Sequence, residues 1–113
     1  MSRPVQLMVA ALLAPGASGQ PVTQAAEQPP LEQGRALFTK GTVPACSLCH
    51  ALKAAGSEGA VGPSLDDLKP DAARVARAMR DGIGLMPSHR GTLSDAQILA
   101  VAEYVAKAAA AGR

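Results

Sequence analysis

Apolar residues recur at helical spacing in the first ordered segment that the pattern predicts, 31–40. Four apolar or small side chains share one face of that segment: Leu31, Gly34, Leu37 and Phe38. Gly41 follows and can end the helix. A glycine in mid-helix costs about 1 kcal/mol relative to alanine. We therefore expect Gly34 to mark a place where another helix backbone approaches closely.

Two further helices are predicted in the second half of the chain. Asp71 can cap a helix that carries Met79 on its apolar face and ends at Gly82. The last helix begins with a capping box made by Ser94 and Gln97. Its apolar stripe follows: Ile98, Val101, Ala102, Tyr104 and Val105. The segment between the first two helices reads as a loop with one short turn, and no segment alternates as a strand does, so we predict an all-α fold.

The first 19 residues have the pattern of a secretory signal peptide. Arg3 supplies one positive charge, an apolar run covers 5–14, and the small residues Ala17 and Gly19 suit signal peptidase. About 10 apolar residues match a signal core but are too few to span a bilayer. A retained N-terminal helix or anchor is the alternative interpretation. Cleavage after Gly19 would place the mature chain outside the cytoplasmic membrane, with no stable membrane insertion.

The domain boundaries follow from a change in composition. Residues 20–30 mix proline, glutamine and small side chains without periodicity, which is typical of a flexible leader. We therefore predict a signal peptide at 1–19, a leader at 20–30 and a single folded domain at 31–113.

The net charge bears on the class of partner, and the aromatic content bears on the core. The chain has 113 residues and a formal net charge of +2, so we expect no nucleic-acid partner. The aromatic residues are Phe38 and Tyr104 alone. Small domains are marginally stable even with large aromatic cores. A group outside the sequence is thus expected to complete the core.

The stretch CSLCH, residues 46–50, holds both cysteines and one of the two histidines. On one helical turn the two thiols and the imidazole lie on the same side. A closed zinc site would need a fourth ligand from a distant residue. A thiol–disulfide exchange site lacks the strand–helix context of its fold. Covalent haem attachment is favoured, because it alone uses all three side chains.

With this motif the chain resembles a class I c-type cytochrome, a monohaem cytochrome c. The resemblance covers about 31–110, in the family's order, and rests on five stretches: GRALF, CSLCH, VGPSL, MP and LSDAQILAVAEYVAKA. It implies three to four helices wrapped around one haem c. It also implies that Cys46 and Cys49 form the thioether bonds, that His50 is the proximal iron ligand and that the Pro63 carbonyl orients His50.

Three side chains compete for the sixth iron position. Met79 continues the apolar face of its helix and is interpreted as a core residue. His89 is a polar residue on a loop, and we expect it to be exposed, unligated and titrating near neutral pH. Met86 lies in the glycine-rich stretch GIGLMPSHRG, where Pro87 restricts the backbone beside it. Family position and local chemistry both favour Met86.

The expected function is one-electron transfer, either as a periplasmic electron carrier or as the haem subunit of a periplasmic dehydrogenase. Histidine with methionine raises the reduction potential and leaves iron no open position. Expected partners are redox proteins: a dehydrogenase, a reductase or a terminal oxidase. The alternative is a haem enzyme or small-ligand sensor in which Met86 leaves the iron. The resemblance does not separate a free carrier from an enzyme subunit.

Overall fold

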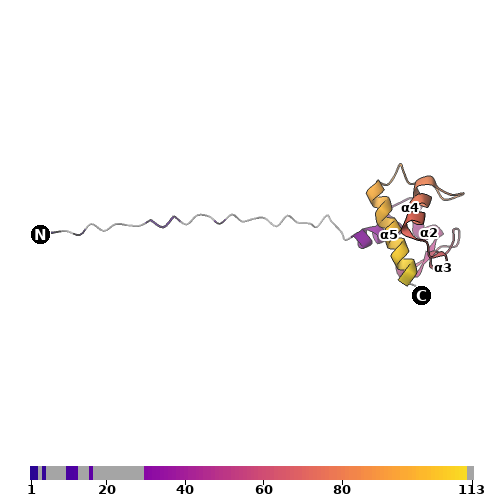
Figure 1. Cartoon of the computed structure of the whole chain (residues 1–113), viewed down its shortest axis with the longest axis horizontal. Coiled ribbons are helices and arrows are strands. Elements are labelled where there is room, and N and C mark those ends of the chain that lie inside the picture. The colour runs from indigo at the N-terminus through magenta and orange to yellow at the C-terminus, as the bar shows by residue number, and fades with distance from the viewer. Residues whose placement is uncertain (3, 5–9, 13–15, 17–29, 112–113) are drawn as a thin grey trace.

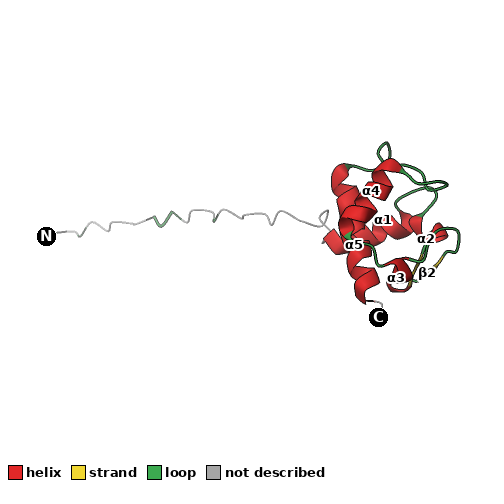
Figure 2. Cartoon of the chain, turned by 45° about the vertical axis from the view of Figure 1, so that its right-hand side comes forward, coloured by secondary structure: helices red, strands yellow, loops and turns green. Residues whose placement is uncertain are grey.

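A computed structural model gives the positions of residues 1–2, 4, 10–12, 16 and 30–111. Most of the predicted signal peptide and nearly all of the predicted leader lie outside these described residues, so both remain predictions. The ordered elements, in chain order, are α1 (Pro30–Lys40), α2 (Cys46–Cys49), β1 (Ala51–Leu52), the 3₁₀ turn η2 (Lys53–Ala55), β2 (Ser57–Glu58), α3 (Leu65–Leu68), α4 (Ala72–Asp81) and α5 (Asp95–Ala111). Figures 1 and 2 show α1 and α4 packed along α5, with the short elements gathered beside them.

The three predicted long helices are present, and two of them begin at the caps that the sequence predicts. The Asp71 side chain accepts a hydrogen bond from the Arg74 amide at 2.7 Å, which satisfies a free N–H group of α4. At the start of α5 the Ser94 hydroxyl accepts from the Gln97 amide at 3.1 Å, and the Gln97 side chain accepts from the Ser94 amide at 2.9 Å. This reciprocal pair confirms the predicted capping box.

The prediction of a purely helical fold is wrong in one detail. Strands β1 and β2 pair antiparallel, with Ala51 opposite Glu58 and Leu52 opposite Ser57. Each strand has two residues, which is too short for an alternating pattern to be recognised in the sequence. Two of the helices, α2 and α3, are single turns. The fold remains mainly helical.

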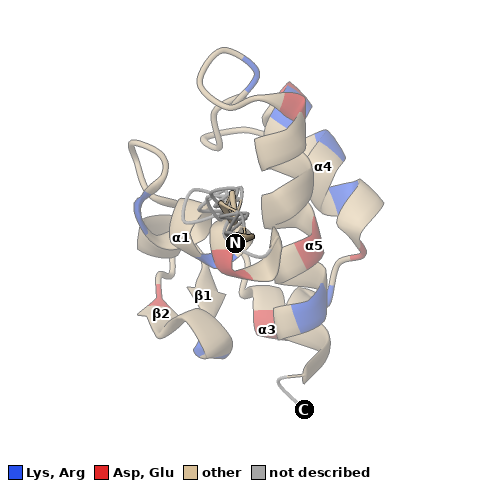
Figure 3. Cartoon of the chain, turned by 90° about the vertical axis from the view of Figure 1, so that its left-hand side faces the viewer, with Lys and Arg blue, Asp and Glu red and all other residues tan. Residues whose placement is uncertain are grey.

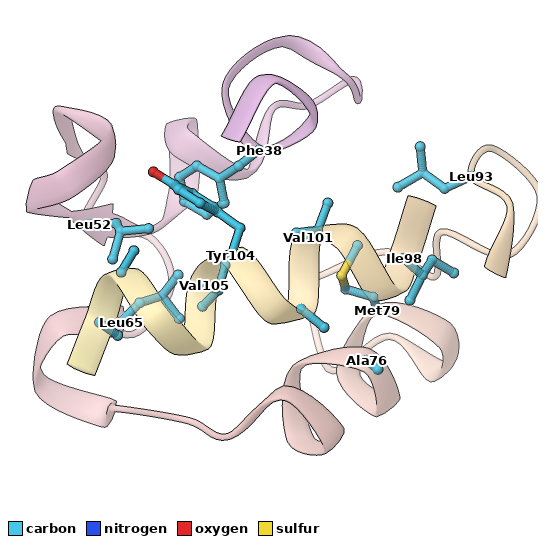
Figure 4. Packing of buried hydrophobic residues seen from close by; sticks show 13 residues of the cluster. Phe38, Leu52, Leu65, Ala76, Met79, Leu93, Ile98, Val101, Tyr104 and Val105 are labelled. Carbon is cyan, nitrogen blue, oxygen red and sulfur yellow. The ribbon is translucent and has the colours of Figure 1, made fainter. Parts of the chain in front are cut away.

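Helices α1 and α5 cross where Gly34 faces Tyr104. A Cβ atom placed on Gly34 would lie 2.6 Å from Tyr104 Cβ and would also overlap the Ala100 carbonyl. Only glycine permits this approach, as the sequence predicted. The rings of Phe38 and Tyr104 pack beside the crossing with their centroids 6.1 Å apart (Figure 4).

The hydrophobic core runs along the buried side of α5, where it meets α1, α3 and α4 (Figure 4). Phe38 is 1% exposed and Ile98 is fully buried. The other large buried side chains are Leu52, Leu65, Met79, Leu93, Val101, Tyr104 and Val105. One partly buried cysteine, Cys46, and one partly buried methionine, Met86, pack against this cluster from separate loops.

Replacement of Gly34 by alanine tests the helix crossing. We expect Gly34→Ala to lower the free energy of unfolding by about 1–3 kcal/mol, because the added methyl group overlaps backbone and Cβ atoms of α5. This loss exceeds the gain of about 1 kcal/mol in helix propensity. Guanidinium unfolding of the holoprotein measures the change in the free energy of unfolding.

Gly91→Ala is the matched control, since nothing lies within 4 Å of a Cβ atom at Gly91. The control should change the free energy of unfolding by less than about 0.5 kcal/mol. Equal stability of the two variants would contradict the close crossing.

Candidate functional site

The two cysteines lie at the ends of α2, a single helical turn. The His50 amide donates to the Cys46 carbonyl at 3.0 Å and closes the turn. Both thiols are free and partly buried. Burial raises the pKa of the Cys46 thiol, and the Thr42 hydroxyl, 3.8 Å from its sulfur, opposes that rise. Burial beside the core therefore favours the neutral thiol form of Cys46.

The imidazole of His50 is held in one tautomer. Its Nδ1 lies 2.7 Å from the Pro63 carbonyl oxygen. A carbonyl oxygen can only accept, so Nδ1 donates and Nε2 keeps its lone pair. This is the arrangement that orients a metal-ligating histidine and raises its basicity.

Glycines let the following segment pack against the cysteine turn, a feature that the sequence analysis missed. A Cβ atom on Gly62 would lie 2.6 Å from Cε1 of His50, and one on Gly59 would lie 2.6 Å from the Cys49 carbonyl carbon. The Gly62 amide also donates to the Cys49 carbonyl at 2.8 Å. The sequence held a clue to this close packing: Gly59 and Gly62 precede Pro63 in a loop where no recognised turn type requires glycine.

A tight backbone hairpin presents Met86. The amides and carbonyls of Ile83 and Met86 exchange two hydrogen bonds, at 3.0 and 2.9 Å. Gly82 enters the hairpin with a φ of +71°, and a Cβ atom there would lie 2.8 Å from the Met86 carbonyl oxygen. Glycine is required on both counts. The Met86 side chain is partly buried against the core.

The residues after Met86 tie the hairpin to the carboxyl end of α4. The His89 amide donates to the Met79 carbonyl at 2.7 Å. The Arg90 guanidinium donates to the Arg80 carbonyl at 3.1 Å and lies 3.2 Å from the Asp81 carboxylate. These groups satisfy helix carbonyls that would otherwise lack partners. The Met86 hairpin is thereby anchored on its carboxyl side.

The structure separates the three candidates for a second iron ligand. Met79 is 2% exposed and packs beside Ile98 and Val101 in the core, as predicted (Figure 4). The expected exposure of His89 is wrong: the residue is 6% exposed, and burial lowers its pKa from the ordinary value of 6.5, away from the expected titration near neutral pH. That His89 is unligated stays a prediction. Its amide donates to the Met79 carbonyl, and its carbonyl accepts from the Thr92 and Leu93 amides.

The structure gives no support to a zinc site at the cysteine turn. Within residues 30–111 no three His, Cys, Asp or Glu side chains are grouped so that they could hold a metal ion. The two thiols and the imidazole are therefore not placed to bind one ion together. His50 itself has extended backbone, outside the helical turn that carries the cysteines. A flat group bonded at its edge to both sulfurs fits this donor set better than a single ion does.

Two comparisons with known proteins agree with this geometry. The family model described as cytochrome C oxidase, cbb3-type, subunit III matches residues 29–105. The crystal structure of the c-type cytochrome SorU from Sinorhizobium meliloti is 49% identical over 71% of this chain and 91% of that chain, with a TM-score of 0.68. The chain belongs to the c-type cytochrome family.

As a c-type cytochrome the protein binds haem c covalently and transfers electrons through its iron. The site fits that group: a turn with two free thiols, an imidazole with Nε2 available, and glycines that clear the space around the ring. In the described part of the chain, no helix has the length and apolar character needed to cross a membrane.

Burial of His89 predicts a pH-dependent stability. The unfolded chain protonates this histidine near pH 6.5, whereas the folded chain does so only at lower pH, because its pKa is lowered. Below about pH 6.5 the unfolded state therefore binds more protons, and the fold loses stability as the pH falls. Above that pH the loss is absent.

Guanidinium unfolding at several pH values compares the native sequence with His89→Gln. The native protein should lose more stability than the variant between about pH 7.5 and 5, since only it carries the depressed histidine. The same carboxylates and His50 are present in both proteins and cancel in the comparison. Parallel pH profiles would contradict the buried neutral state of His89.

Proposed function

We propose that this c-type cytochrome carries single electrons with a haem held by Cys46, Cys49, His50 and Met86. The cysteines form the thioether bonds, His50 binds iron from one face, and Met86 binds it from the other. The single observation that carries the proposal is the hydrogen bond from His50 Nδ1 to the Pro63 carbonyl, at 2.7 Å.

That hydrogen bond prepares His50 as a ligand. Because Nδ1 holds the proton, Nε2 is free to bind iron without first losing one. The Pro63 carbonyl fixes the rotation of the ring, and Gly62 leaves room for the imidazole. The two groups that contact the ring directly, the Pro63 carbonyl and Gly62, both belong to the backbone.

Met86 is supported by the way its loop is held. Two hydrogen bonds with Ile83 define the hairpin, and the segment that follows is tied to the end of α4. Met79, the other methionine of this region, is buried in the core. A thioether on an anchored loop can serve as a stable axial ligand.

When bound, haem c supplies reversible one-electron chemistry at iron. The thioether of Met86 favours the ferrous state, and apolar surroundings disfavour the extra positive charge of the ferric state. With His50 and Met86 both in place no iron position is open to a substrate. These features favour electron transfer over catalysis.

We further propose that the protein acts in the periplasm with redox proteins as donor and acceptor. The predicted signal peptide supports export, and the partners would be a dehydrogenase, a reductase or a terminal oxidase. The protein would serve either as a free carrier or as the haem subunit of such an enzyme. Basic positions on α4 stand close to acidic ones near its ends (Figure 3), and Arg80 lies 3.7 Å from Asp95. Because positive and negative side chains lie close together here, the surface of α4 gives no reason to propose a strongly acidic partner.

A haem enzyme or small-ligand sensor would need Met86 to leave the iron. The hairpin bonds and the contacts of Arg90 with the end of α4 work against that movement. The structure therefore favours the carrier.

The absorption spectrum tests Met86. A methionine-ligated ferric haem shows a weak far-red charge-transfer band, and Met86→Ala should abolish it by removing the thioether. The reduced variant should then bind carbon monoxide rapidly, because one iron position is open.

Met79→Leu is the control, since it keeps an apolar side chain of similar volume in the core. The control should retain the band and resist carbon monoxide. Absence of the band in the native protein, or its survival in Met86→Ala, would rule out Met86 as the ligand.

A further inference from the structure

Asp66 is a buried carboxylate that the site described so far does not use. It lies on α3 and is 8% exposed. Its Oδ2 accepts a hydrogen bond from the Lys53 amide at 2.9 Å. Its Oδ1 is buried and has no hydrogen-bond partner among the described residues. Such a group is costly to bury, so its presence calls for an explanation.

The position of Asp66 links the two segments that meet at His50. Lys53, whose amide it binds, is three residues after His50. Pro63, whose carbonyl binds the imidazole, is three residues before Asp66. Three residues span at most about 10 Å. Two short backbone segments, 50–53 and 63–66, are therefore joined by two hydrogen bonds: one from the Lys53 amide to the Asp66 carboxylate, the other from the His50 imidazole to the Pro63 carbonyl.

The charge of Asp66 is not neutralised by a direct ion pair. The Lys69 ammonium lies close, but it donates to the Asp66 backbone carbonyl at 2.7 Å. Within residues 30–111 no Lys, Arg or His nitrogen approaches the Asp66 carboxylate to 4.0 Å. The nearby Lys69 ammonium offsets part of the field of the carboxylate. Burial leaves the remainder less screened by water and salt than the field of a surface charge is.

We propose that Asp66 is a positioning residue for His50 and that its charge lowers the reduction potential of the haem iron. By holding Lys53 it keeps the Pro63 carbonyl against Nδ1 of His50. A buried negative charge near the proximal segment also stabilises ferric iron, which carries one more positive charge than ferrous iron. The inference rests on the proposed role of His50 as an iron ligand.

Two substitutions separate positioning from charge. Asp66→Asn removes the charge but keeps an oxygen that can accept from the Lys53 amide. Asp66→Ala removes both. Asp67→Asn is the matched control, because Asp67 is the next residue of α3 and is exposed. The reduction potential and the hyperfine-shifted proton resonances of the His50 ring are measured in each ferric holoprotein.

Both Asp66 variants should have a higher reduction potential than the native protein, with a shift at least about twice that of Asp67→Asn, as expected for a less screened charge. Asp66→Asn should keep the native His50 resonances, whereas Asp66→Ala should displace them, since the ring orientation is no longer fixed.

Equal shifts of the potential in Asp66→Asn and Asp67→Asn would overturn the electrostatic part. Native His50 resonances in Asp66→Ala would overturn the positioning part. If Asp66→Ala does not fold, displaced His50 resonances in Asp66→Glu, which keeps the charge but moves the carboxylate, support positioning, and native resonances contradict it. Failure of His50 as a ligand is distinguishable, because the native protein itself would then show no iron-shifted imidazole resonances.

Discussion

The close contact of α1 with α5 at Gly34 is the constraint on which the rest of the structure depends. The two helices stand at opposite ends of the folded domain in sequence, so their contact brings all the intervening segments into one body. The cysteine turn and the Met86 hairpin both lie in connections between long helices, and both pack against the core along α5. A haem bound between them would therefore be held by loops whose ends are fixed by helix packing.

Backbone groups, more than side chains, shape the site. Pro63 contributes a carbonyl, Gly62 contributes the absence of a side chain, and Gly82 contributes a backbone with positive φ. Backbone atoms have fewer ways to rearrange than long side chains do. A rigid ligand frame of this kind suits electron transfer, since little reorganisation has to accompany the movement of the electron.

Two buried polar residues lie near the segments that carry the proposed iron ligands. His89 lies on the methionine side, with its amide bound to the Met79 carbonyl. Asp66 lies on the histidine side, with its carboxylate bound to the Lys53 amide. Each couples a ligand-bearing segment to a neighbouring helical element, and each is buried despite a side chain that prefers water.

The sequence by itself determined the three long helices and the haem cofactor. Helix caps at Asp71 and Ser94, the mid-helix Gly34 and the CSLCH motif are local patterns, and local patterns can be recognised without knowing what packs against them. Only the tertiary structure decided that His89 is buried, that β1 and β2 pair, and that Asp66 joins Lys53. Those outcomes depend on contacts between residues distant in the chain, or on pairings too short to leave a periodic signal, because burial is a property of the packed fold and not of a residue type.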